Sequence, residues 1–352
     1  MINNLPNTHF TANWSSPIHH LNPATYSLAR RINDFIKSAV FFVPNFFLEK
    51  ITRSLIYPAS SYLFKKKVSN QAIKEFNAIN DPSDVILKTP DGAELKGHFF
   101  QHRNHNQPNS RVIILFHGNG DFYQSGSWFN ISQTLLELDE PISYFVFNPR
   151  GVGESSGCPN VSKLLIDAES AYQYVKNGLG VSEDRIDLYG HSLGGAQAAQ
   201  LKAQHSNTGG KLILDRTFSN LMMESEYILS RLRLNYSLIK KIAHFFIKTY
   251  DWNFKSDEAI KHIKDPVYIF THEQDRVIPP EVNIAKTVEN WNIQPDNFHV
   301  YSFNDRFGDA HNKPLKDLIQ FKKQGVRSGA DYLKSVFDPQ IEIELNDQEI
   351  AF

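Results

Sequence analysis

The feature that most constrains the fold of this 352-residue chain is a repeated alternation of short apolar runs with helical patterns after residue 110. Continuous apolar runs of this length, separated by helical segments, are typical of a parallel sheet covered on both faces. We therefore predict an α/β protein with a mainly parallel, doubly wound sheet. The runs are RVIILF (111–116), SYFVF (143–147), RIDLY (185–189), KLIL (211–214), PVYIF (266–270) and FHVYSF (298–303).

Two further patterns precede this region. VILKTPDGAELKGHFF (85–100) consists of two strand-like runs around Asp91-Gly92, which indicates a hairpin. Residues 24–80 carry helical patterns broken by Pro44 and Pro58, and residues 1–22 are a polar segment for which we predict a loose tail. The net charge of −1 gives no electrostatic basis for nucleic-acid binding. The single cysteine, Cys158, excludes an intramolecular disulfide and fits a reducing compartment.

Chemistry in such a sheet is expected where the strands end, because ligands bind at the carboxyl ends of parallel strands. The segments that follow the six runs are rich in Ser, His, Asp and Gly. They are HGNGDFY from His117, NPRGVGESSG from Asn148, GHSLGG from Gly190, DRTFSN from Asp215, THEQDRVIPP with Asp275, and NDRFGDAHNKP with His311.

Gly190-His191-Ser192-Leu193-Gly194 is a G-x-S-x-G motif directly after a strand and directly before a helix. That context predicts a nucleophile elbow, in which a sharp turn presents the serine hydroxyl above the sheet. Such a turn requires small neighbours, which Gly190, Gly194 and Gly195 provide. The alternative is a tight strand-to-helix turn in a non-catalytic protein.

A serine hydroxyl needs a base, and the base needs a third group that orients it. Ser192, Asp275 and His311 follow one another in the order Ser, Asp, His that is expected for an elbow of this kind, and each follows a strand. We therefore predict that these three residues are catalytic, with Asp215 as the rival acid. Backbone N–H groups near Asn119 and at Leu193 are the predicted oxyanion hole.

Taken together, these motifs resemble the α/β-hydrolase superfamily over residues 84–337. Within it the chain is most similar to the branch of membrane-associated serine hydrolases, such as monoacylglycerol and lysophospholipid lipases and protein depalmitoylases. The resemblance implies the α/β-hydrolase fold and acyl transfer without cofactor or metal. It also favours Asp275 over Asp215 as the acid, because QDRVIP matches the acid loop of the family. The matching segments are FHGNG (116–120), PRGVGESSG (149–157), GHSLGG (190–195), DRTFSN (215–220), DWNFKSDEAIKHIKDPV (251–267), EQDRVIP (273–279) and GDAHN (308–312).

Two positions depart from the family pattern, which usually has Asp at Asn148 and Gly at His272. We expect His272 to be a surface loop histidine. His191 and His117 are expected to have structural roles, and Arg150 is expected to pair with an internal carboxylate rather than to bind a substrate. The paired His19 and His20 have no nearby carboxylate or cysteine partner, so no metal site is expected there. Cys158 has no local signature of a nucleophile.

Residues 221–264 are too long for a simple crossover between strands, so they predict a helical cap. In SLIKKIAHFFIKTY (237–250) the pattern favours one apolar and one basic side. Two interpretations remain open: a lid with its apolar side on the core, or a helix that lies on a membrane together with the aromatic-rich residues 35–50. The apolar side comprises Leu238, Ile239, Ile242, Phe245, Phe246 and Thr249, and the basic side Lys240, Lys241, His244 and Lys248.

The predicted organisation is an N-terminal tail and helical extension (1–80), a first core part (81–220), the cap (221–264), a second core part (265–337) and an acidic tail (338–352). The predicted function is a serine hydrolase that cleaves lipid-like acyl esters or thioesters. A peptidase of the same fold and a non-catalytic binding module are the alternatives. We expect a cytoplasmic or peripheral membrane protein. The end IEIELNDQEIAF (341–352) also resembles export signals of type IV-secreted bacterial effectors.

Overall fold

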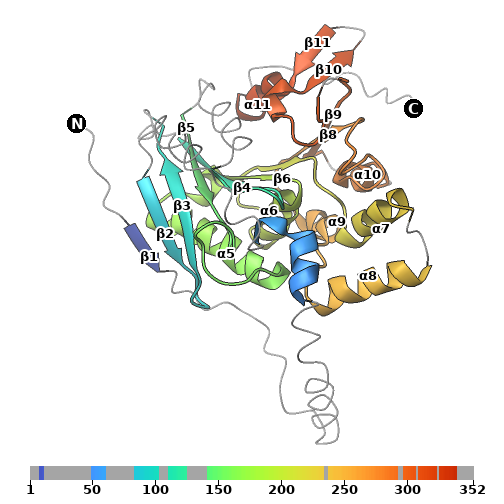
Figure 1. Cartoon of the computed structure of the whole chain (residues 1–352). Helices are drawn as coiled ribbons and strands as arrows, with labels where there is room; N and C mark the ends of the chain where they lie inside the picture. The colour runs from blue at the N-terminus through green and yellow to red at the C-terminus, as the bar shows by residue number, and fades with distance from the viewer. Residues whose placement is uncertain are drawn as a thin grey trace, which may run out of the picture.

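The structure is a computed structural model (Figure 1). It describes residues 8–11, 49–60, 83–102, 110–124, 141–233, 237–291, 296–306, 308–322 and 325–338, and the side chains of 8–11 and 238 are not described. The predictions for residues 12–48 and 61–80, for the histidine pair at 19–20 and for the end 341–352 lie outside these ranges. Within them, no helix has the length and apolar character that a membrane span requires.

The centre of the molecule is a nine-stranded sheet with the order β1-β2-β3-β5-β4-β6-β7-β8-β9. The six strands from β5 to β9 pair in parallel, whereas β3 is antiparallel to both β2 and β5. The strands are β1 (Thr8–Thr11), β2 (Ser83–Lys88), β3 (Glu94–Phe100), β4 (Arg111–Phe116), β5 (Ile142–Phe147), β6 (Ile186–His191), β7 (Leu212–Asp215), β8 (Val267–His272) and β9 (Phe298–Phe303).

All six apolar runs and the hairpin therefore form strands as predicted. Gly92, in the hairpin turn, has φ +87°, a conformation that glycine adopts without strain. The prediction of a loose tail is wrong at Thr8–Thr11, because this stretch pairs in parallel with β2 at the edge of the sheet. A four-residue edge strand made of polar and aromatic residues carries no apolar run that would have revealed it.

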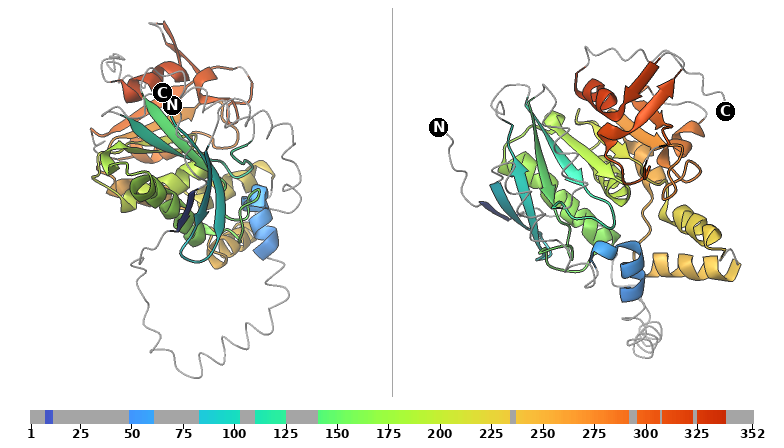
Figure 2. Two further views of the ribbon diagram at one scale, coloured as in Figure 1. Left: turned by 90° about the vertical axis from the view of Figure 1, so that its left-hand side faces the viewer. Right: turned by 45° about the horizontal axis from the view of Figure 1, so that its top comes forward.

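Both faces of the sheet are covered, which explains why its central strands are apolar throughout (Figures 1 and 2). Alternate residues of β4 enter two different cores, because successive side chains of a strand point to opposite faces. Val112, Ile114 and Phe116 pack in a core with residues of helices α5, α6 and α10. Ile113 and Leu115 pack in the other, with residues of α11.

The remaining elements lie between and after the strands. Residues 49–56 are helical. The predicted helix at 164–179 begins earlier, at an Asn160 cap, and its last turn widens into a π-helical turn. The other bounds are η2 (Pro58–Ser60), α5 (Val161–Gln173), η3 (Tyr174–Gly178), η4 (Glu183–Arg185), α6 (Leu193–Gln204), α7 (Leu221–Arg231), α8 (Ser237–Thr249), α9 (Ser256–Ala259), η5 (Ile260–His262), α10 (Ile284–Glu289), η6 (Leu315–Asp317), β10 (Ile319–Lys322), β11 (Gly325–Ser328) and α11 (Gly329–Phe337).

The segment predicted as a cap, 221–264, contains α7 and α8 and, after them, the short α9 and η5. Helices α7 and α8 make up most of it. Their buried residues join one apolar cluster with the end of the N-terminal helical segment and with Leu193, the residue after the elbow serine. Helices α7 and α8 and residues 56–59 thus pack together beside the start of α6 (Figure 1). The cluster includes Tyr57, Ala59, Leu193, Phe218, Leu221, Ile247, Trp252 and Ile278.

Helix α8 does not present the separate apolar and basic sides that its pattern favours. Ile242 and Phe245, which the lid interpretation places on the core, are 45% and 61% exposed, and the helix is anchored instead by the buried Ile247. Lys240 and His244 of the basic side are half-buried and reach Glu226 of α7. Packing against α7 decides the orientation, because Lys240 and His244 both reach the Glu226 carboxylate there. The exposed side of α8 consequently mixes apolar and basic residues: Lys241, Ile242, Phe245, Lys248 and Thr249.

Candidate active site

Ser192 lies at the turn between β6 and α6 with φ 54° and ψ −121°, a strained conformation for a residue with a side chain. Three glycines make the turn possible. A Cβ atom on Gly190 would lie 2.4 Å from the Cα of Gly195, and one on Gly194 would lie 2.1 Å from the carbonyl oxygen of Phe116. This is the geometry of a nucleophile elbow.

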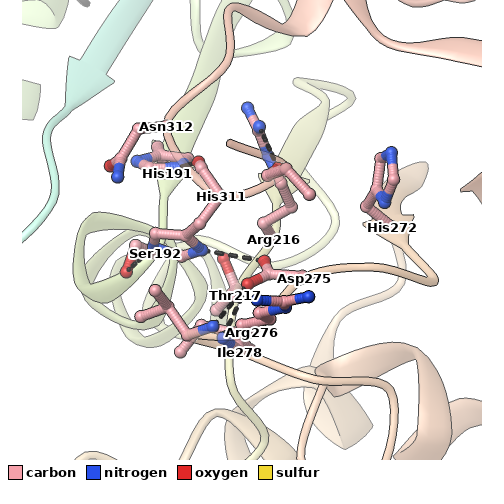
Figure 3. Close-up of polar contacts among 12 residues, drawn as sticks. His191, Ser192, Arg216, Thr217, His272, Asp275, Arg276, Ile278, His311 and Asn312 are labelled. Carbon is pink, nitrogen blue, oxygen red and sulfur yellow. Dashed lines mark hydrogen bonds and ion pairs between the residues drawn. The ribbon is translucent and has the colours of Figure 1, made fainter. Parts of the chain in front are cut away.

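The structure brings Ser192, His311 and Asp275 together from three loops that follow β6, β9 and β8 (Figure 3). Oγ of Ser192 lies 3.2 Å from Nε2 of His311, and Nδ1 of His311 lies 2.8 Å from Oδ2 of Asp275. All three side chains are buried. With the hydrogen on Nδ1 donated to Asp275, Nε2 is free to accept the serine proton, which is the arrangement of a serine–histidine–acid triad.

Asp275 is fixed by its own loop. Its Oδ1 accepts hydrogen bonds from the backbone N–H groups of Val277 and Ile278, at 2.8 and 2.9 Å. Two charge-stabilising donors therefore hold the carboxylate in place, and Oδ2 is left for the imidazole.

Asp215, the rival acid, has other partners. Its carboxylate accepts two hydrogen bonds from Arg216, at 2.7 and 2.8 Å, and one from the hydroxyl of Tyr189 at 2.5 Å. Burial alone would raise the pKa of Asp215, but the adjacent guanidinium outweighs burial and keeps that pKa below its ordinary value. Asp215 is thus an ionised partner of Arg216, and the acid that meets His311 is Asp275.

Arg216 links this ion pair to the histidine loop. It is buried with φ +48°, and its Nη1 donates to the carbonyl oxygens of Ala310 and Lys313, at 2.8 and 2.7 Å. These two carbonyls bracket His311 in the sequence, so one guanidinium fixes both sides of the loop that carries the base. Sequence reasoning considered this loop for the rival acid Asp215 and missed the contact of Arg216, because it joins residues nearly a hundred positions apart.

Two further histidines border the site. Nε2 of His191 lies 3.0 Å from the carbonyl oxygen of His311, and Nδ1 of His117 lies 3.0 Å from that of Gly118. Burial lowers the pKa of His191 to about 4, so it is neutral at neutral pH and can donate to the His311 carbonyl. Both contacts agree with the predicted structural roles.

His272 is not a surface histidine as predicted, since it is 1% exposed. Its Nδ1 accepts a hydrogen bond from the backbone N–H of Gln274 at 3.0 Å, and its Nε2 lies 3.4 Å from Asp305. Asp305 also pairs with Lys313 at 2.9 Å. His272 is therefore part of a buried network behind the acid loop, where glycine would make no side-chain contact.

The loop after β4 supplies the predicted oxyanion-hole residue Asn119. A Cβ atom on Gly118 would lie 3.5 Å from the Cβ of Ser192, so this loop passes close to the serine. The side chain of Asn119 turns away, since it donates to the carbonyl oxygen of Ile56 at 3.2 Å, and the backbone N–H remains the group that could face the site. Leu193 is the first residue of α6, where backbone N–H groups have no partner within the helix.

The loop after β5 is structural. Asn148 accepts a hydrogen bond from the backbone N–H of Tyr123 at 3.0 Å, which ties this loop to the one that carries Asn119. Arg150 forms ion pairs with Asp91 at 2.6 Å and with Asp167 at 2.7 Å. The predicted internal pairing of Arg150 is confirmed.

Comparison with known proteins agrees with this architecture. A family profile described as "alpha/beta hydrolase fold" matches residues 111–239. An alpha-beta hydrolase from Vibrio vulnificus superposes with a TM-score of 0.58 at 20% identity, covering 75% of this chain and 88% of that one. Est1E from Butyrivibrio proteoclasticus superposes with a TM-score of 0.51 at 17% identity, covering 71% of this chain and 95% of that one.

Two curated proteins are similar in sequence. The protein bem46 of Schizosaccharomyces pombe is 28% identical over 66% of this chain and 73% of its own length. The lysophosphatidylserine lipase ABHD12 of Danio rerio is 30% identical over 49% of this chain, and the match spans less than half of that protein, 45%.

The chain has the α/β-hydrolase fold. Residues 111–239 match the family profile of that fold, and the architecture of the described residues agrees with it.

Proposed function

We propose that this protein is a serine hydrolase that cleaves acyl esters or thioesters through an acyl-enzyme on Ser192. The observation that carries the proposal is the continuous contact from Ser192 through His311 to Asp275 at a strained elbow. A serine in a merely structural turn needs neither the strained backbone nor a buried imidazole held by a carboxylate.

In this mechanism Oγ of Ser192 attacks the acyl carbonyl while Nε2 of His311 takes the hydroxyl proton. Asp275 keeps the hydrogen of His311 on Nδ1 and stabilises the imidazolium. The backbone N–H groups of Leu193 and Asn119 are the proposed donors to the oxyanion, helped by the N-terminus of α6. The imidazolium then gives its proton to the leaving alcohol or thiol, and water releases the acyl group by the reverse sequence.

A lipid-like substrate is the class that the surroundings favour. The similar zebrafish protein is described as a lysophosphatidylserine lipase. The elbow itself adjoins an apolar cluster contributed by the cap and by the end of the N-terminal helical segment. An acyl chain that packs against these side chains would gain about 0.8 kcal/mol for each buried methylene.

A panel of acyl esters, thioesters and peptides with graded acyl chains tests this function. We expect turnover of esters or thioesters, with kcat/KM rising as the chain lengthens because each added methylene is buried. Cleavage of peptides alone would instead indicate a peptidase. No cleavage and no reaction with a fluorophosphonate would indicate a binding module.

We also propose that the exposed side of α8 contacts an anionic membrane, with Ile242 and Phe245 in the interface and Lys241 and Lys248 near the head groups. Replacing both lysines with glutamine should weaken sedimentation with anionic liposomes. Each lysine near such a surface contributes about 1 kcal/mol, so the loss for two is about 30-fold at low salt. Salt should weaken wild-type binding in the same assay.

Lys240→Gln is the matched control for this prediction. Lys240 belongs to the same helix, but it is half-buried and pairs with Glu226 at 3.3 Å, so its loss should leave liposome binding nearly unchanged. Equal losses for Lys240 and for the exposed pair, or no binding by the wild type, would contradict a role for this surface.

A further inference from the structure

Glu224 of α7 is a buried carboxylic acid to which the proposed mechanism gives no role. It is 3% exposed, and neither of its carboxyl oxygens has a hydrogen-bond partner within the part of the chain that the structure describes. Buried polar groups are nearly always hydrogen-bonded, so an unpartnered carboxyl is an exception that calls for an explanation.

Glu224 lies on α7, the cap helix that contacts the loop carrying Asp275. It lies one helical turn after Leu221, which packs in the cluster that also holds Leu193 and Ile278. The far end of α7 meets the same loop, because Arg231 donates to the carbonyl oxygen of Arg276 at 2.5 Å.

Local structural roles do not account for Glu224. The N-cap of α7 is Asn220, whose side chain accepts from the backbone N–H of Met222 at 2.9 Å, so the helix does not need Glu224 as a cap. Two α8 side chains that reach α7 are also engaged elsewhere, since Lys240 pairs with Glu226 at 3.3 Å and His244 lies 3.1 Å from the same carboxylate, two residues further on.

Burial and the nearby Asp275 raise the pKa of Glu224 to about 8. The free protein at neutral pH therefore holds Glu224 mainly as the neutral acid. A positively charged group that binds next to the Glu224 carboxyl would pair with its ionised form and so displace its proton. A neutral hydrocarbon would leave the carboxyl without a partner.

We propose that Glu224 is a recognition group for an organic cation, such as a substituted ammonium, carried by the substrate. This proposal rests on the proposed function, because the cation would belong to the molecule whose acyl group reacts at Ser192. The imidazole of His311 separates Asp275 from Ser192. The cation would consequently belong to the head group of the substrate, away from the scissile carbonyl.

Two esters with the same short acyl chain test the proposal: the choline ester and its uncharged isostere, the 3,3-dimethylbutyl ester. The measured quantity is the ratio of their kcat/KM values at pH 8.5, where Glu224 is mainly ionised. We expect a ratio of about ten in the wild type, as one favourable ionic contact gives, and a ratio near one in Glu224→Gln. Glu226→Gln, a change of the same kind on the same helix, should keep the wild-type ratio.

A second measurement does not depend on turnover. Calorimetry with choline alone should show binding to the wild type. Below pH 8 the affinity should increase about tenfold for each unit by which the pH is raised, and above pH 8 it should level off, because only the ionised carboxyl binds the cation. Glu224→Gln should remove the pH dependence. If that variant does not fold, the wild-type pH profile decides the matter by itself.

The outcomes separate this proposal from the proposed function. Equal ester ratios in the wild type and Glu224→Gln, or choline binding that is absent or independent of pH, would overturn the role of Glu224 while hydrolysis continued. Choline binding with the expected pH profile, in a protein that cleaves no ester and gives no adduct at Ser192, would support the cation site and overturn the hydrolase.

Discussion

Ser192→Ala is expected to lower kcat for the best ester by a factor on the order of 10⁶, which is the loss seen when a triad serine is removed. The reason is that no other side chain offers an oxygen within reach of Nε2 of His311, which Oγ of Ser192 approaches at 3.2 Å, among the residues that the structure describes. Steady-state rates of the wild type and the variant, measured with the same ester, provide the comparison.

The thermal stability of Ser192→Ala supplies the control. Alanine also has a Cβ atom, so the backbone strain at φ 54° remains in the variant and the melting temperature should change little. A variant that folds normally and retains more than a few per cent of the wild-type rate would remove Ser192 from its proposed role.

Asp275→Asn is expected to lower kcat by about 10⁴, because an asparagine amide favours the wrong tautomer of His311 and cannot stabilise an imidazolium. The carboxylate lies 2.8 Å from Nδ1 of His311, and its other oxygen accepts two backbone N–H groups. We expect the change to act on kcat more than on KM, since Asp275 does not contact the substrate in the proposed mechanism.

Asp215→Asn is the matched comparison, and its effect should be of a different kind. Asp215 pairs with the buried Arg216, and breaking one side of a buried ion pair costs about 3–5 kcal/mol of stability. We therefore expect a clear fall in melting temperature together with a smaller loss of kcat in the protein that remains folded. A stable Asp215→Asn variant with a 10⁴-fold loss, next to an active Asp275→Asn, would reverse the assignment of the acid.

Much of this fold could be predicted from the sequence, because its central strands are buried on both faces and so appear as continuous apolar runs. The site residues could be located for a related reason: each follows one of those runs, and parallel strands end at one edge of the sheet. Ser192, Asp275 and His311 are far apart in the chain, yet topology alone predicts that their loops meet.

Features that depend on packing between distant segments could not be predicted. The contact of Arg216 with the carbonyl oxygens around His311 leaves no local pattern, and neither does the burial of His272 next to Asp305. Which apolar residues of α8 are buried could not be predicted either, because the helical pattern treats them all alike, whereas the fold buries Ile247 and leaves Phe245 exposed. The unpartnered state of Glu224 likewise becomes visible only once α7 is placed on the acid loop.

Identification of the residue that a fluorophosphonate modifies tests the central claim most directly. After brief exposure of the wild-type protein to the reagent, peptide mass spectrometry should find one adduct, on Ser192, and the adduct should be absent from Ser192→Ala. A base-activated serine reacts far faster than a solvated one, so the label should appear before any other hydroxyl reacts. A wild-type protein that stays unmodified, or an adduct on another residue that persists in Ser192→Ala, would contradict the assignment of Ser192 as the nucleophile.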